Sequence, residues 1–65
     1  MKIWKVKEMI KILEADGWYL CRHKGTSHRQ FKHAVKKGGV TVPGNLNDEL
    51  ISKTAKSILT QAGLI

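Results

Sequence analysis

The residues most suited to chemistry lie in segment 24–31, which has the sequence KGTSHRQF. His28 lies there among cations and small hydroxyls, and histidine is the side chain that exchanges a proton near neutral pH. Cations beside it would hold a phosphate and stabilise charge that builds up on it. These groups are the minimum needed to cut RNA without a metal, which makes His28 a candidate catalytic residue; the alternative, which the segment by itself favours, is a surface histidine at the end of a hairpin with solvated charges around it. The predicted nucleic-acid contacts are Arg22, Lys24, Ser27 and Arg29.

The length and charge of the chain narrow the classes of protein to which it can belong. Its 65 residues predict a single domain, 1–65, whose core is too thin to enclose a large substrate cavity. The 12 lysines and arginines against 5 aspartates and glutamates give a formal charge of +7, and the cations are spread along the chain. A folded surface of this kind attracts a polyanion, and nucleic acid is the leading candidate.

Cysteine content and hydropathy predict a cytoplasmic protein. Cys21 is the single cysteine, so an internal disulfide framework and a cysteine-rich zinc module are both excluded. The first residues, MKIWKVK, lack the unbroken apolar core of a signal peptide. No segment approaches the roughly 20 apolar residues that cross a bilayer.

A helix is predicted over residues 4–16, because apolar side chains recur there at helical spacing. Gly17 supplies the left-handed residue that ends a helix, and Trp18 just beyond it can pack back on Leu13. A second helix is predicted to begin near Ser52, a good N-cap residue, and to end at Gly63, with Leu64 folding back on the helix. Its expected apolar stripe comprises Ile51, Ala55, Ile58, Leu59 and Ala62.

Three strands are predicted between the helices, over residues 18–23, 27–35 and 40–42. The turns fall at 24–26 and 36–39, and Pro43 ends the third strand since proline cannot donate to a ladder. Residues 45–51 are expected to form a polar connector with a single helical turn. Alternation along the second strand predicts that His28 points to one face and Phe31 to the other.

The predicted fold class is α+β, in the order α-β-β-β-α, with a three-stranded antiparallel sheet and two helices on one face. The two helices need one sheet face to bury their apolar stripes, which leaves the other face open to water. This outline is that of a double-stranded RNA-binding domain. An outline constrains architecture only, so function has to be argued from the site.

Three segments resemble the HicA family of bacterial mRNA interferase toxins. They are residues 25–31 (GTSHRQF), 40–43 (VTVP) and 56–64 (KSILTQAGL), and the resemblance covers essentially the whole chain. Two departures from the family pattern are visible: Thr26 stands between Gly25 and Ser27, and Asn45 follows Pro43 where many relatives carry a basic or histidine-containing segment.

The resemblance implies a function and a partner. The family's catalytic histidine, in the G-S-H motif of the second strand, corresponds to His28. The implied substrate is mRNA, and the implied partner is a HicB-like antitoxin that binds the toxin and covers its active site. The implied mechanism is metal-independent transesterification, in which His28 deprotonates the 2′-hydroxyl of RNA or protonates the departing 5′-oxygen. No cofactor is expected.

Several other interpretations of the same residues stay open. One alternative is that His28 is a surface histidine among solvated charges, and another is that it is a contact residue of a non-catalytic RNA-binding module. His23 and His33 are near enough in sequence to act as a second acid or base, although we expect each to be a solvated strand residue. A metal site formed by the three histidines is disfavoured, because zinc usually adds cysteine or carboxylate ligands and only Cys21 is close.

Overall fold

The computed structural model describes residues 3–24 and 28–65, and at Lys24 it describes the backbone alone. The predicted turn residues Gly25 and Thr26 and the predicted contact Ser27 therefore lie outside the described residues. Within these ranges the order is β1 (Trp4–Lys5), α1 (Val6–Ala15), β2 (Trp18–Lys24), β3 (His28–His33), β4 (Gly39–Pro43), β5 (Glu49–Leu50) and α2 (Ser52–Gln61).

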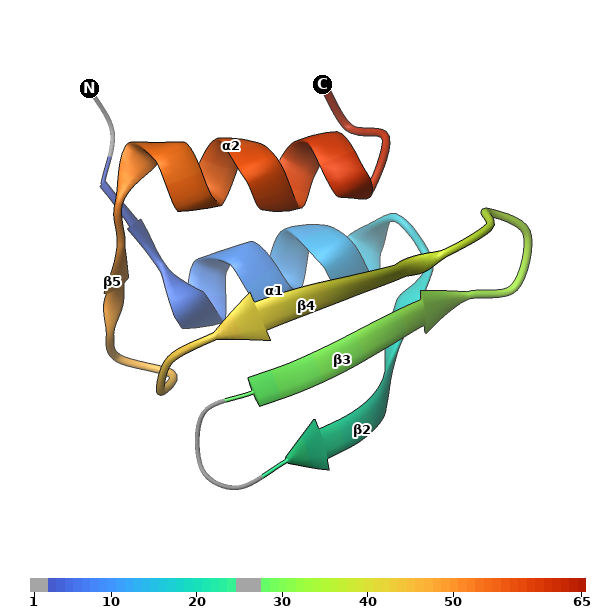
Figure 1. Cartoon of the computed structure of the whole chain (residues 1–65), viewed down its shortest axis with the longest axis horizontal. Coiled ribbons are helices and arrows are strands. Elements are labelled where there is room, and N and C mark those ends of the chain that lie inside the picture. The colour runs from blue at the N-terminus through green and yellow to red at the C-terminus, as the bar shows by residue number, and fades with distance from the viewer. Residues whose placement is uncertain (1–2, 25–27) are drawn as a thin grey trace.

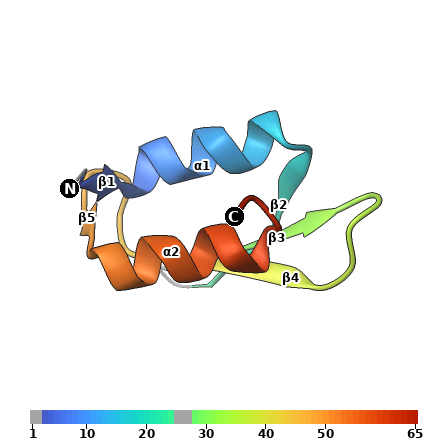
Figure 2. The same cartoon turned by 90° about the horizontal axis from the view of Figure 1, so that it is seen from above.

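The main sheet is antiparallel and has the strand order β2-β3-β4 (Figure 1). The helices α1 and α2 run roughly parallel to each other (Figure 1), and α2 contacts β4 and lies beside it in Figure 2. The predicted α+β fold, with three antiparallel strands and two helices, is confirmed.

One hydrophobic core joins both helices to one face of the sheet. The helix residues Val6, Met9 and Leu13 recur every three or four positions, so they form the buried stripe of α1. Phe31 at the centre of β3 is 1% exposed and belongs to the same cluster. The other members of the cluster are Trp18, Val40, Val42, Leu50, Ala55, Ile58 and Ala62.

The end of α2 has the hydrogen bonds of a Schellman motif. The Leu64 N–H donates to the Leu59 carbonyl at 2.9 Å, and the Gly63 N–H donates to the Thr60 carbonyl at 3.1 Å. Gly63 has φ +72°, a left-handed conformation that glycine adopts without a steric penalty. Leu64 packs against the core, so the predicted stop of this helix is confirmed.

The start of α1 differs from the prediction. The helix begins at Val6 because residues 4 and 5 are extended in β1, which pairs with β5. The first N–H groups of a helix have no partner inside it. The connector provides two partners: the Val6 N–H donates to the Asp48 carbonyl at 2.9 Å, and the Lys7 N–H donates to the Leu46 carbonyl at 3.1 Å. In the connector, the Asp48 N–H donates to the Asn45 carbonyl at 2.9 Å and closes a single turn, whereas the second half is extended and forms β5.

The start of α2 also corrects the prediction. Ile51, and not Ser52, is the N-cap residue, and its backbone is extended with φ −66° and ψ 151°. Ile51 was expected in the apolar stripe of this helix, but 69% of it is exposed. The extended backbone at this position turns the side chain away from the buried face of α2.

We predict that Gly17→Ala destabilises the fold more than Gly38→Ala. Both glycines have positive φ, +101° and +82°, so alanine is strained at either position. At Gly38 an added Cβ meets nothing within 4 Å, and the loss should be about 1–2 kcal/mol. At Gly17 the Cβ would lie 2.7 Å from His33 Nε2, which should add about 1–3 kcal/mol.

The measurement is the free energy of unfolding of both variants and the unsubstituted protein, from urea titration at neutral pH. Gly38→Ala is the matched control, because it also puts alanine at a positive φ but without the contact to His33. Equal losses for the two variants would contradict the packing seen around Gly17.

Candidate active site

His28 is the first residue of β3 and is exposed. Its Cα stands opposite Lys24 of β2 and Pro43 of β4, so one row of residues crosses the sheet there. Exposure alternates along β3, with Phe31 buried and His28 exposed. The predicted orientation of these two side chains is confirmed, and His28 lies on the face of the sheet opposite the core. We call this the open face.

A bulge in β2 sets which cations share the open face with His28. The pairing of β2 with β3 shifts between Leu20 and Arg22, where the exposed Cys21 is the extra residue. Regular alternation from the buried Trp18 would have turned Arg22 toward the helices. The bulge instead sets Arg22 opposite Gln30, so its side chain lies on the open face, in the next row of that face after the row of His28. Nothing in the sequence analysis indicated this irregularity.

Arg29 lies on the other face of the sheet. Its Nη1 donates a hydrogen bond of 2.9 Å to the Gly44 carbonyl, and the side chain is half-buried. The bond ties the start of β3 to the segment that follows β4. The structure therefore does not bring Arg29 together with His28, and its contact with nucleic acid stays a prediction. The same holds for Lys24, whose side chain is not described, and for Ser27.

The charged residues in the strands of the main sheet are all positive. The sequences of β2, β3 and β4 are WYLCRHK, HRQFKH and GVTVP, with four lysines and arginines and no aspartate or glutamate. The five acidic residues of the chain lie elsewhere, at Glu8, Glu14, Asp16, Asp48 and Glu49. Segregated positive charge of this kind raises the local concentration of an anionic ligand.

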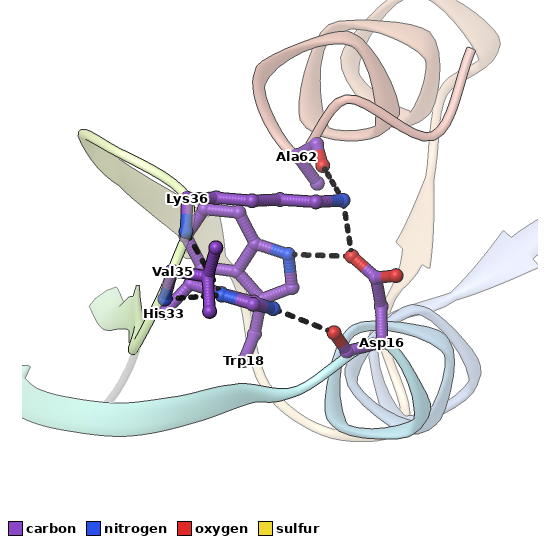
Figure 3. A network of polar contacts seen from close by, with 6 residues as sticks. All are labelled: Asp16, Trp18, His33, Val35, Lys36 and Ala62. Carbon is purple, nitrogen blue, oxygen red and sulfur yellow. Dashed lines mark hydrogen bonds and ion pairs between the residues drawn. The ribbon is translucent and has the colours of Figure 1, made fainter.

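His33 is a structural residue, which corrects the expectation that it is solvated (Figure 3). Its Nδ1 accepts hydrogen bonds of 3.0 Å from the backbone N–H groups of Val35 and Lys36. An imidazole nitrogen that accepts carries no proton, so Nε2 must carry it and donate to the Asp16 carbonyl at 2.7 Å. The ring also lies edge-on to Trp18, with centroids 5.2 Å apart. Both ring nitrogens are therefore engaged in hydrogen bonds that stabilise the fold.

The Asp16 carboxylate and the Lys36 ammonium form an ion pair next to His33, where the two helices end (Figure 3). Lys36 Nζ donates to Asp16 Oδ2 at 2.5 Å and to the Ala62 carbonyl at 2.9 Å, so it joins the ends of both helices. The Trp18 indole N–H donates to the same carboxylate oxygen at 3.2 Å. The hydrogen bond from Lys36 holds the pKa of Asp16 below its ordinary value, although desolvation of the carboxylate acts in the opposite direction.

The remaining histidine, His23, is exposed and stands opposite Arg29, so it does not share the row of His28. Within residues 3–24 and 28–65, no three histidine, cysteine or carboxylate side chains are gathered as a metal ion would require. None of the helices in the described part of the chain is long and apolar enough to span a membrane.

Comparison with known proteins agrees with this architecture. A model of the HicA toxin of bacterial toxin–antitoxin systems matches residues 6–64. The chain belongs to the HicA toxin family. A solved structure described as a toxin–antitoxin complex from Streptococcus pneumoniae contains a chain that is 35% identical to this HicA-family protein. The match covers 92% of this chain and 97% of that chain, with a TM-score of 0.73. A search of curated proteins found no match.

We predict that Asp16→Asn lowers the free energy of unfolding at neutral pH and that the deficit shrinks in acid. A group whose pKa is lowered by folding stabilises the native state above its unfolded pKa, and this contribution is lost as the pH falls through the folded pKa. The ordinary pKa of Asp16 is 3.8, so the unsubstituted protein should lose its advantage over the variant below that pH.

The measurement is urea unfolding of both proteins from neutral pH down into the acid range. Glu14→Gln is the matched control, because it removes one carboxylate from an exposed position on the same helix. A deficit for Asp16→Asn that stays constant across this range would show that the carboxylate charge does not stabilise this end of the fold.

Proposed function

We propose that this HicA-family protein is a metal-independent endoribonuclease that cleaves mRNA, with His28 as the residue that transfers the proton. The observation that carries the proposal is the position of His28 on the open face of a sheet whose strands contain cations and no carboxylates. Among the described residues, it is the histidine on that face, since His23 and His33 belong to rows that face the other way.

RNA supplies its own nucleophile in the proposed reaction. The 2′-oxygen attacks the adjacent phosphorus, the bond from phosphorus to the 5′-oxygen breaks, and the products are a 2′,3′-cyclic phosphate and a 5′-hydroxyl. His28 accepts the proton of the 2′-hydroxyl or donates one to the departing 5′-oxygen. Arg22 in the next row is placed to stabilise the negative charge that builds up on the phosphate oxygens.

We further propose a HicB-like antitoxin as the protein partner and the cytoplasm as the location. The solved relative is described as part of a toxin–antitoxin complex, which supports a partner of that class. A chain of charge +7 is suited to rapid capture by an acidic protein, because complementary charge raises the association rate. Such a partner would block the enzyme by covering His28.

We predict that the purified protein cuts single-stranded or structured RNA in excess chelator and leaves DNA of the same sequence intact. DNA lacks the 2′-hydroxyl, so it offers no nucleophile to this mechanism. Replacing His28 by alanine should lower the cleavage rate by about 10²–10⁴-fold, the usual contribution of a general acid or base. Rates come from gel assays, and end mapping identifies the termini.

His23→Ala is the matched control, because it removes an exposed imidazole from a neighbouring position of the same sheet and should change the rate little. Cleavage that stops in chelator, or products with 5′-phosphate ends, would exclude the proposed chemistry. Salt-dependent RNA binding without cleavage would instead show a non-catalytic RNA-binding module.

We also predict that the product of the adjacent open reading frame co-purifies with a tagged form of this chain and protects RNA from it. Arg22→Glu should weaken the complex and make its association less sensitive to salt, because rim charges act mainly on the on-rate. Lys53→Glu, at an exposed position of α2, makes the same charge change away from the open face. A partner that fails to protect RNA would contradict the antitoxin proposal.

A further inference from the structure

The open face extends well beyond the row of His28. Two more rows cross the sheet, and each is set by the pairing of β2, β3 and β4. The second contains Arg22, Gln30 and Thr41, and the third contains Tyr19, Lys32 and Gly39. Lys32 lies four residues from His28 along β3, so the first and third rows are about 14 Å apart at roughly 3.4 Å per residue.

Tyr19 in the third row is an aromatic residue that the core does not use. It is 52% exposed, whereas its neighbour Trp18 is 2% exposed and belongs to the core. The ring shares its face with the exposed Lys32, and the third member of the row, Gly39, has no side chain that would occupy the adjacent surface. An exposed ring beside a cation is the arrangement with which proteins hold an unpaired base and its phosphate.

We propose that Tyr19 and Lys32 form a nucleotide-binding subsite for single-stranded RNA, two rows from His28. A base stacks on the Tyr19 ring while Lys32 contacts the phosphate of the same strand. The strand then runs along β3, past Arg22 in the middle row, and reaches His28 with the phosphate to be cleaved. This subsite rests on the proposed ribonuclease function, for which it would hold the substrate.

The charge of this face and the exposed Tyr19 ring together indicate which kind of RNA the subsite binds. The strands that form this face contain no carboxylate, so the surface is complementary to a polyanion. A paired base has its faces covered by its neighbours in the duplex, and a base can stack on a protein ring only where it is unpaired. The combination therefore favours a single strand over a duplex. Stacking accepts every base, so we expect little sequence preference from this subsite.

The binding test uses His28→Ala protein, which keeps the RNA intact during the measurement. Fluorescence anisotropy with labelled single-stranded RNA should show that adding Tyr19→Ala weakens binding about 10-fold, as expected for the loss of one stacked base. Tyr19→Phe should retain the affinity, because phenylalanine keeps the stacking ring. Binding of duplex RNA should not change.

Leu20→Ala is the matched control. Leu20 is the next residue of β2 and is 49% exposed, but it stands opposite the buried Phe31 and so belongs to the other face. Its truncation removes a similar amount of exposed apolar surface from the same strand. If Leu20→Ala weakens RNA binding as much as Tyr19→Ala does, the effect comes from the edge strand as a whole and the subsite is wrong.

A second readout separates the subsite from catalysis. In the protein with His28 intact, Tyr19→Ala should raise KM for a long single strand about 10-fold and leave kcat unchanged, since it removes binding that is equal in the ground state and the transition state. The advantage of long over very short RNA substrates should disappear with it. Cleavage by the unsubstituted protein with no effect of Tyr19→Ala on KM or affinity would overturn the subsite and leave the ribonuclease proposal standing.

Two further outcomes are distinguishable. If the protein binds RNA through Tyr19 but does not cleave it, the ribonuclease proposal fails and the subsite stands as part of a binding module. If Tyr19→Ala leaves RNA binding unchanged and weakens only the complex with the co-purified partner, the third row serves the protein partner, and the nucleotide subsite is overturned.

Discussion

In a chain of 65 residues, the two helices cover only one face of the three-stranded sheet. The other features of the molecule depend on that limit. Both helices place their apolar stripes against the face that contains Phe31, Val40 and Val42, and this forms the core. Within residues 3–24 and 28–65, no apolar layer covers the open face, so lysine, arginine and histidine can stand there without the cost of burying charge. The thin core thus leaves the open face, with the described cations Arg22 and Lys32, available for a ligand.

The two ends of this layered structure are held by polar contacts of different kinds. At one end, the connector before β5 supplies carbonyl groups to the first N–H groups of α1. At the other, His33, Asp16 and Lys36 join β3, the end of α1 and the end of α2. These contacts fix the sheet to the helices where the apolar core ends. They also engage His33 on both ring nitrogens, which separates its role from that of His28.

Local patterns in the sequence predicted the features that depend on near neighbours. Alternation along β3 was enough to place His28 and Phe31 on opposite faces, and Gly63 followed by Leu64 was enough to end α2. The pairing of β1 with β5, the bulge at Cys21 and the hydrogen bond of His33 to Asp16 were missed. Each of these depends on groups more than a dozen residues apart or on the register between two strands, and neither leaves a periodic signal.

The geometry of the proposed reaction makes alignment of the substrate more important here than in an enzyme with two catalytic histidines. In an in-line displacement the attacking 2′-oxygen and the departing 5′-oxygen lie on opposite sides of phosphorus, so one imidazole reaches one of them directly. The second proton transfer then falls to a cation of the open face or to water, and both are weaker partners. Rate that is not supplied by a second acid or base has to come from holding the strand in the reactive geometry. Arg22, in the open-face row next to that of His28, is placed to hold the phosphate in that geometry.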